Sequence, residues 1–210
     1  SIAGAQTLAT RYLRVEFGPR GMTSITDRSD ASTHRFPADH FAVTIDNQTY
    51  ESGRLAAPGQ SRSRYATGYH YRAGGFGITV TYELKPEWRF VSKQVSVTSA
   101  SLPTFRVSDI TLFRETLAES PIEVFTPSSA RPSLGTGEYG AAVRFADRRS
   151  LLLVAQNPFL RFSLQDKVAT LGYAPDLEWK TSYGAFESDR GLIAPVRLSG
   201  HRLPARMIPE

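Results

Sequence analysis

The stretch TSYGAFESDRG, residues 181–191, gathers side chains that could perform acid–base chemistry. If residues 186–190 are extended, Glu187 and Asp189 project from one face with Cα atoms about 6.6 Å apart. Paired carboxylates about 5–9.5 Å apart cleave glycosidic bonds, one as the acid and the other as nucleophile or base. Here both would lie along one strand rather than on two sides of a bond, and Arg190 offers them an ion-pair partner. Whether this pair is catalytic is therefore left open.

Two other roles fit the longer stretch DLEWKTSYGAFESDRG, residues 176–191. Aromatic rings pack flat against the C–H face of a sugar, while polar neighbours bond its hydroxyl groups. On this hypothesis the carbohydrate-binding residues are Trp179, Tyr183, Glu187 and Asp189. The alternative is a structured loop that docks against a further domain.

The stretch YHYRAGGFG, residues 69–77, offers a second candidate sugar contact. Tyr69 and Tyr71 alternate with His70 and Arg72, so an extended chain would present rings on one face and polar groups on the other. The four residues are predicted to bind carbohydrate if the aromatic face is exposed. If this strand belongs to the core, the two tyrosine rings are buried instead.

No cofactor or metal site is predicted. The histidines at 34, 40, 70 and 201 lack zinc-motif spacing, and the chain has no cysteine. DRSDAS supplies Asp27 and Asp30 without the regular acidic series of a calcium loop, which favours a solvated turn. TPSSARPSLG (126–135) is not a nucleophile elbow, and RAGGFG (72–77) joins two predicted strands rather than opening a helix.

The charge pattern argues against a nucleic-acid partner. The 210-residue chain has a formal net charge of +5, but 21 of its 25 basic residues are arginines scattered singly among Asp and Glu. Nucleic-acid binders concentrate positive charge, because their affinity comes from neutralising neighbouring phosphates. No apolar run approaches the roughly 18 residues needed to cross a bilayer, so no membrane span is predicted.

Alternation of apolar and polar residues dominates the chain. It is clear in YLRVEF (12–17), FAVTID (41–46) and GITVTYEL (77–84). Successive side chains of a strand point to opposite faces, so this period of two predicts half-solvated antiparallel sheets. SLLLVAQ (150–156) is apolar throughout, which predicts a central strand covered on both faces.

Turns and phase changes complete the fold prediction. Asp46–Asn47 is typical of a hairpin turn, and the phase shifts in EWRFVSKQVSV (87–97) and TFRVSDITLF (104–113) predict a bulge or bend in each. Helical periodicity is missing, although LFRETLAE (112–119) could form a turn or two. The predicted class is an all-β antiparallel sandwich of about 12–16 strands.

The chain is predicted to be one domain of a longer protein. No repeat or low-complexity linker divides residues 1–210, so they are expected to form a single β-sandwich domain. GHRLPARMIPE (200–210) is polar and proline-bearing, like a linker leading onward, and this predicts an N-terminal module. A natural tail is the alternative.

Three stretches resemble a known family. LRVEFGPRGMTSITDRSD (13–30) resembles the opening hairpin of β-sandwich domains that precede the catalytic barrel in several glycoside hydrolases. FAVTIDNQTYESGRL (41–55) is similar to their next hairpin, and VTYELKPEWRFVSKQVSVTS (80–99) to the long strands after it. The resemblance covers most of residues 10–200. It implies the galactose-mutarotase-like supersandwich, as in the N-terminal domains of α-galactosidase-related bacterial enzymes.

The resemblance also implies a role. The chain is expected to be a non-catalytic N-terminal module of a bacterial glycoside hydrolase that packs on a C-terminal catalytic domain and contributes to carbohydrate binding. No histidine lies in a motif that matches the stand-alone mutarotases, so no epimerase residue is carried over. The alternatives are a free-standing carbohydrate-active enzyme (an aldose epimerase or a polysaccharide lyase) and a carbohydrate-binding surface module. The expected location is periplasmic or secreted.

Overall fold

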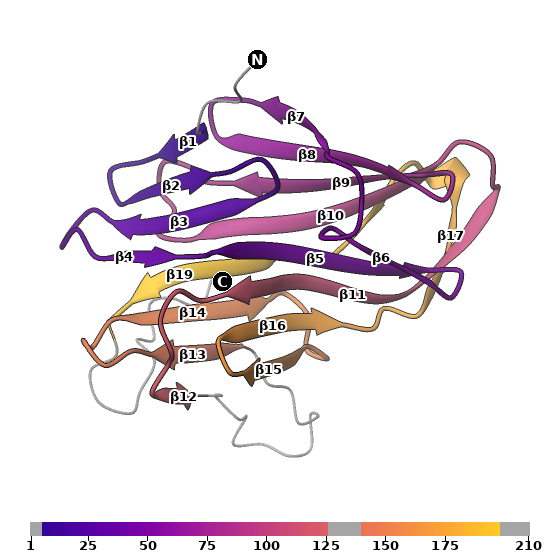
Figure 1. The fold of residues 1–210 in the computed structure, drawn as a ribbon. Coiled ribbons are helices and arrows are strands. Elements are labelled where there is room, and N and C mark those ends of the chain that lie inside the picture. The colour runs from indigo at the N-terminus through magenta and orange to yellow at the C-terminus, as the bar shows by residue number, and fades with distance from the viewer. Residues whose placement is uncertain (1–5, 126–139, 198–210) are drawn as a thin grey trace.

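The computed structural model describes residues 6–125 and 140–197, and strands dominate this part of the chain (Figure 1). The sequence features TPSSARPSLG, GHRLPARMIPE and His201 lie outside the described residues. The only helical element among the described residues is a single 3-10 turn, η2 (Thr181–Tyr183). The prediction of an all-β antiparallel fold is confirmed.

Three antiparallel sheets make up the fold. The four-stranded sheet contains, in spatial order, β1 (Gln6–Ala9), β2 (Leu13–Phe17), β3 (Met22–Asp27) and β4 (Thr33–Arg35). The six-stranded sheet has the order β15 (Arg161–Gln165), β16 (Val168–Tyr173), β11 (Thr104–Thr116), β5 (Ala38–Ile45) and β6 (Gln48–Glu51), with β17 (Leu177–Lys180) paired to β11.

The nine-stranded sheet is the largest. Its order is β12 (Glu123–Phe125), β13 (Ala141–Arg144), β14 (Ser150–Ala155), β19 (Gly191–Val196), β10 (Val91–Ser99), β9 (Phe76–Glu83), β8 (Ala66–Ala73) and β7 (Gly59–Arg62), with β18 (Phe186–Glu187) paired to β10. The described residues thus form 19 strands, more than the 12–16 expected. Strands as short as β18 hold too few residues to show an alternating pattern.

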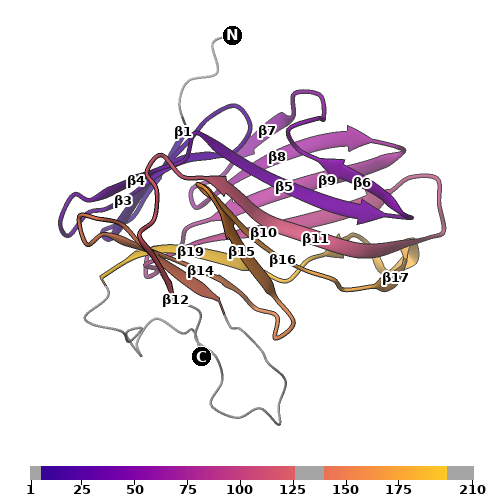
Figure 2. The same cartoon turned by 60° about the horizontal axis from the view of Figure 1, so that its bottom comes forward.

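The nine- and six-stranded sheets form two layers around a shared apolar core (Figure 2). Strict alternation explains how each layer covers it. In β9, Ile78, Val80 and Tyr82 are buried, while the threonines between them are half exposed. The four-stranded sheet closes one end of this core with Val15, Ile25 and their neighbours.

β14 is buried on both faces, as predicted for a central strand. Leu151 and Leu153 belong to the main core, whereas Leu152 joins a second, small apolar cluster on the opposite face. That cluster consists of Ala142, Leu152, Ala194 and Val196, with Phe90, Phe125 and Val154 packed against it.

The irregular runs resolve differently. β11 has register shifts against β5 near Ser108 and after Thr111, so the bulge predicted in TFRVSDITLF is confirmed. In EWRFVSKQVSV the phase change falls before β10 begins at Val91, and β10 pairs with β9 without a register shift, so no bulge forms there. The helical turn considered for LFRETLAE is wrong, because β11 continues to Thr116 with Glu115 buried.

The hairpin predicted at Asp46–Asn47 is confirmed. Both residues have positive φ, 48° and 65°, and they connect β5 to β6. Asp and Asn tolerate this left-handed conformation better than most residues, and their turn twist matches that of the flanking strands.

Candidate functional site

The nine-stranded sheet turns one face away from the core, and this outer face carries a row of polar side chains. The strand register places His70 of β8, Thr79 of β9, Ser96 of β10 and Glu187 of β18 opposite one another on successive strands. Residues paired in this way project from the same face of an antiparallel sheet. We call these four residues the polar row.

Hydroxyl groups hold the His70 imidazole on both sides. Its Nε2 lies 2.7 Å from Ser61 Oγ, and its Nδ1 lies 3.1 Å from Thr79 Oγ1. A neutral imidazole donates from one nitrogen and accepts at the other, and a hydroxyl group can serve either role. The two contacts therefore fix the ring orientation at the exposed surface, which is the preorganisation that a binding site requires.

Two glycines beside the polar row let neighbouring hydroxyl groups lie close to the backbone. A Cβ at Gly68 would lie 2.6 Å from Ser61 Oγ, and a Cβ at Gly77 would lie 2.7 Å from Thr98 Oγ1. Ser61 pairs directly with Gly68, so the missing side chain is what lets the Ser61 hydroxyl reach His70. Glycine inside a strand often marks a place where another group approaches the backbone closely.

The pair of acidic residues from TSYGAFESDRG is split between two surroundings. Glu187 is exposed at the end of the polar row. Asp189 is also exposed, with buried Ser188 between them, and its carboxylate accepts a hydrogen bond of 2.8 Å from Asn157 Nδ2. Arg190 pairs with Glu83 rather than with either acid, which corrects the ion pair considered from sequence.

Trp179 of β17 and Tyr183 of η2 form an aromatic pair in the segment that leads to β18. Their ring centroids are 5.8 Å apart in an edge-to-face arrangement, and the Trp179 Nε1–H donates to Gly184 O at 3.0 Å. The Tyr183 residue is 66% exposed. Trp179 also contacts buried Phe186 and packs against the main core, so its ring lies on the core side of β18, whereas Glu187 projects from the opposite face.

The stretch YHYRAGGFG is divided between core and surface. Tyr69 and Tyr71 are 0% and 3% exposed, and their hydroxyl groups donate to Gly18 O at 2.7 Å and Arg20 O at 3.3 Å. Burial raises the pKa of Tyr71 to about 12. These two rings lie in the interior, the alternative that the sequence left open, so they are not available to stack on a sugar. His70 and Arg72 are exposed on the outer face.

The geometry suits recognition of hydroxyl groups better than proton transfer on one sugar ring. His70 and Glu187 are three strand steps apart, roughly 14 Å at the usual spacing between strands. A general acid and a general base must both come within hydrogen-bond reach of the reacting group. A row of hydroxyl, imidazole and carboxylate groups can instead contact several positions along an oligosaccharide.

No cluster of three or more His, Asp or Glu side chains that could hold a metal ion occurs in residues 6–125 and 140–197. In the DRSDAS turn, Asp27 and Asp30 accept backbone hydrogen bonds of 2.8 Å from Ser29 and Ser32, and Asp30 also pairs with Arg197. Nor does the described chain contain a helix with the length and hydropathy of a membrane span.

Ser61, Gly68, Thr79 and Ser96 were not predicted to belong to the site. They come from four strands whose pairing cannot be derived from one sequence, and no motif identifies them. The alternation in YHYR was the only usable signal, and it correctly placed His70 and Arg72 together on a polar face.

No protein-family model matches the chain, and no curated protein matches it. Solved structures do match. A protein from Escherichia coli K12 whose name assigns it to the aldose 1-epimerases has a TM-score of 0.61 and 11% identity, over 92% of this chain and 99% of that one. An α-N-acetylgalactosaminidase from Bifidobacterium bifidum has a TM-score of 0.55 and 8% identity, over 91% of this chain and 36% of the galactosaminidase. A polysaccharide lyase has a TM-score of 0.55 and 14% identity, over 91% of this chain and 34% of the lyase.

These likenesses, at such low identity, establish the fold alone. The chain has the galactose-mutarotase-like β-sandwich fold, which confirms the fold that the sequence resemblance implied. It spans nearly the whole of the E. coli protein but only about a third of the galactosaminidase and of the lyase.

Proposed function

We propose that this chain is a carbohydrate-binding β-sandwich module of a bacterial glycoside hydrolase, acting outside the cytoplasm and packing on a catalytic domain of the same protein. The observation that carries the proposal is the His70 imidazole, held between Ser61 and Thr79 on an open polar face. The solved structures with this fold include enzymes named for acting on sugars, and the chain matches about a third of the galactosaminidase.

On this proposal a neutral oligosaccharide lies along the polar row. His70, Ser96 and Glu187 bond its hydroxyl groups, and the exposed Tyr183 ring packs against a sugar face. Neutral sugar hydroxyl groups donate and accept in turn, as do the hydroxyl groups of the row. The absence of a side chain at Gly68 keeps the Ser61 hydroxyl group in contact with His70, so the imidazole is already oriented when the ligand arrives.

The direct test is an NMR titration of the chain with neutral oligosaccharides of several linkages. We expect saturable shifts at His70 and Ser96 with at least one ligand. His70→Ala should weaken binding about tenfold, since a lost hydrogen bond in a binding site is worth roughly 0.5–1.5 kcal/mol and the oriented ring is lost with it. Thr49→Ala, on the exposed edge strand β6, is the control and should bind normally. If no neutral glycan binds, the proposal is wrong.

The modular part has its own test. Reading the gene beyond the codon for Glu210 should reveal a catalytic domain, and a reading frame that stops there would contradict a module that packs on one.

A second candidate is an aldose epimerase, favoured by the match over 99% of the E. coli protein. It requires a histidine and a carboxylate on either side of one sugar ring, and His70 and Glu187 lie too far apart for that. NMR of anomer interconversion decides the matter, because a rate above that of buffer would support the epimerase and overturn the non-catalytic role.

A further inference from the structure

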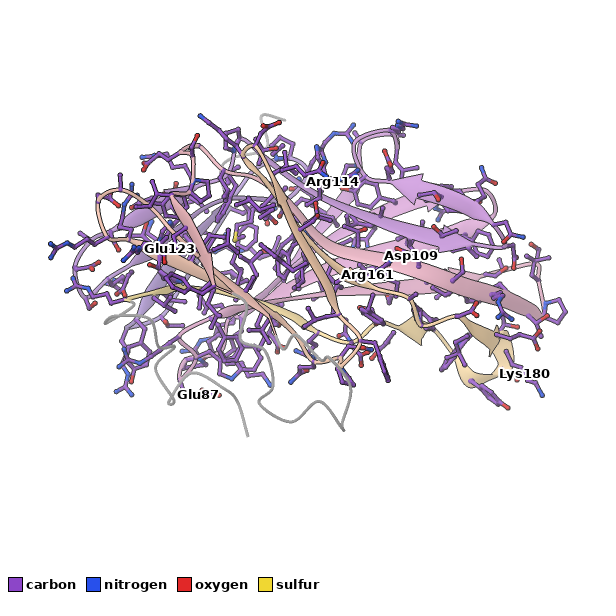
Figure 3. The ribbon with its side chains drawn as sticks, turned by 90° about the horizontal axis from the view of Figure 1, so that it is seen from below. Glu87, Asp109, Arg114, Glu123, Arg161 and Lys180 are labelled. Atoms are coloured by element: carbon purple, nitrogen blue, oxygen red, sulfur yellow. The ribbon has the colours of Figure 1, made fainter. Side chains whose placement is uncertain are left out.

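A cleft of about 450 Å³ lies where three turns of the sandwich meet, away from the polar row. Its lining comes from the β1–β2 turn with Arg11, the β7–β8 turn with Arg64 and Tyr65, and the β9–β10 turn with Pro86 and Glu87. Figure 3 shows Glu87 at the opposite end of the molecule from Lys180. The volume is within the range of about 300–1,000 Å³ that small-ligand sites occupy.

Arginines gather on tyrosine rings around this cleft. The guanidinium of Arg11 lies 4.5 Å from the ring centroid of Tyr12, and that of Arg89 lies 4.1 Å from the same ring. Arg64 lies 5.1 Å from the centroid of Tyr65. Arg11 and Arg64 line the cleft, and Arg89 lies beside it on the ring that Arg11 also contacts. We call these three residues the arginine cluster. Cation–π contact fixes the position of a guanidinium without neutralising its charge.

The arginine cluster has no carboxylate partner in the described part of the chain. Most other described arginines do: Arg106 pairs with Asp176 and Arg197 with Asp30, for example. Holding like charges near one another without a counter-charge is unfavourable, and the positive field that they create attracts anions. An incoming anion would meet guanidinium groups whose five N–H donors suit carboxylate or sulfate oxygens.

Hydrogen bonds keep the three turns in place before any ligand arrives. Thr10 Oγ1 accepts from the Leu13 amide at 3.2 Å in the β1–β2 turn. The β7–β8 turn is closed by the Ser63 amide, which donates to Ala66 O at 2.9 Å, and the Leu84 amide ties it to β9 by donating to Tyr65 O at 2.8 Å. Such preorganisation reduces the entropy that binding would lose.

The remaining chemistry of the cleft favours a sugar over a nucleic acid. Glu87 is the only carboxylate among the described lining residues, and it can accept hydrogen bonds from sugar hydroxyl groups. Tyr65 offers a ring face for the C–H side of a sugar. Two arginines that line one short cleft, with a third beside it, also do not form the extended basic stripe that polyphosphate binding needs.

We infer that this cleft is a second carbohydrate site, specific for a sugar unit that carries an anionic group, a carboxylate or a sulfate. The arginine cluster binds the anion, Glu87 accepts from neighbouring hydroxyl groups, and the Tyr65 ring packs on the sugar. The inference rests on the proposed function only in that the ligand is a glycan. The cleft and the polar row are separate sites.

The test is calorimetric titration of the whole chain with defined probes. Tetragalacturonate supplies carboxylates, its methyl ester supplies the same sugars without charge, and a sulfated galactose disaccharide supplies the other anion. We expect binding of tetragalacturonate, of the sulfated disaccharide or of both, weakened by added sodium chloride, and no binding of the methyl ester at the cleft. Octathymidylate is the nucleic-acid probe and should bind more weakly than the better acidic glycan.

Arg11→Gln/Arg64→Gln should lower affinity for the acidic glycan at least tenfold, because each lost contact is a charge-assisted hydrogen bond. Arg114→Gln/Arg161→Gln removes the same net charge from the outer face of the six-stranded sheet and should bind like the unmodified chain. Equal loss in both double variants, unchanged affinity in the first, equal binding of the methyl ester, or tighter binding of octathymidylate would each overturn the inference.

The two sites can fail independently. His70→Ala should leave binding of the acidic glycan unchanged and weaken only the neutral oligosaccharide. Loss of neutral binding alone would count against the proposed function, whereas failure of both acidic probes to bind would count against the cleft.

Discussion

Lys93 and Asp39 form an ion pair in the interior of the sandwich, with both side chains fully buried. The Lys93 ammonium comes from β10 and the Asp39 carboxylate from β5, so the pair joins the two main sheets. Asp39 also accepts from the Tyr82 hydroxyl group and from the Met22 amide. Burial by itself would raise the pKa of Asp39, but the Lys93 charge and the hydrogen bonds from Lys93 and Tyr82 hold that pKa below its ordinary value.

Removing Lys93 should destabilise the fold severely. Lys93→Met keeps the length of the side chain but leaves the Asp39 carboxylate without its counter-charge in the core. Breaking a buried ion pair from one side costs about 3–5 kcal/mol. Urea unfolding at neutral pH should show this loss in the free energy of unfolding.

The control removes both charges at once. Lys93→Met/Asp39→Leu should recover part of the lost stability, since no isolated charge remains, although the Tyr82 hydroxyl group and the Met22 amide lose their acceptor. A Lys93→Met variant as stable as the unmodified chain would show that the pair does not anchor the two sheets.

Glu115→Gln should stabilise the protein, and more so as the pH rises. Burial raises the pKa of Glu115 well above its ordinary value, the nearby Asp39 adds to this, and Lys93 opposes it. The folded state therefore keeps the Glu115 proton at pH values where the unfolded state releases it. As the pH rises above about 4.3, the free energy of unfolding of the unmodified protein therefore falls. Glutamine has no proton to lose. Unfolding measured from acidic to mildly alkaline pH should show a growing gap between the two proteins, and a constant gap would contradict a neutral Glu115.

The layered fold could be predicted from sequence because most inward residues are apolar. In GITVTYEL the alternation alone identified the buried face of β9. The buried charges also occupy inward positions: Asp39 is in phase with Phe41, and Lys93 is in phase with Val95. Pattern alone assigns charged residues to the surface, and only the pairing of β5 and β10 across the core shows that two inward charges meet.

The sites were less predictable, because they depend on which strands are neighbours. His70 could be placed on a polar face, but its partners Ser61 and Thr79 are each nine residues away and come from adjacent strands. Arg11, Arg64 and Arg89 are scattered in the sequence, and the fold brings them together at one end. Arginines that are spread singly along the sequence can therefore still lie close together in the folded chain.

His34 should make the protein less stable in mild acid. The side chain is buried at the β3–β4 hairpin, and burial, assisted by the charge of Arg149, lowers its pKa to about 4. The unfolded state binds a proton near pH 6.5 while the folded state resists it, so stability falls as pH drops from about 6.5 to about 4, by up to about 3 kcal/mol.

His34→Gln tests this prediction, because it replaces the imidazole by a group that does not titrate. The free energy of unfolding, measured in urea at several pH values, should depend less on pH in the variant across that window. Above pH 6.5, the free energy of unfolding should change with pH in the same way in both proteins. Identical slopes within it would show that His34 is protonated as readily in the folded state as in the unfolded state.

Gly68→Ala should damage the polar row while leaving the fold intact. The added Cβ would lie 2.6 Å from Ser61 Oγ and 3.4 Å from His70 Nε2, so the Ser61 hydroxyl group must move and its hydrogen bond to His70 breaks. We expect weaker binding of the neutral oligosaccharide, by about tenfold, from loss of the oriented imidazole. The His70 ring signals in NMR should broaden or shift even without ligand.

Gly59→Ala is the matched control for this prediction. Gly59 lies on β7, the edge strand that also holds Ser61, and it pairs with His70. A Cβ at Gly59 would meet only His70 Cβ and O, both at an ordinary 3.9 Å. The two variants therefore add the same methyl group to neighbouring strands, two register steps apart, and only Gly68→Ala displaces Ser61. Glycan affinity should be unchanged in Gly59→Ala and about tenfold lower in Gly68→Ala. Equal binding by both variants would show that the Ser61–His70 contact does not position the imidazole for a sugar.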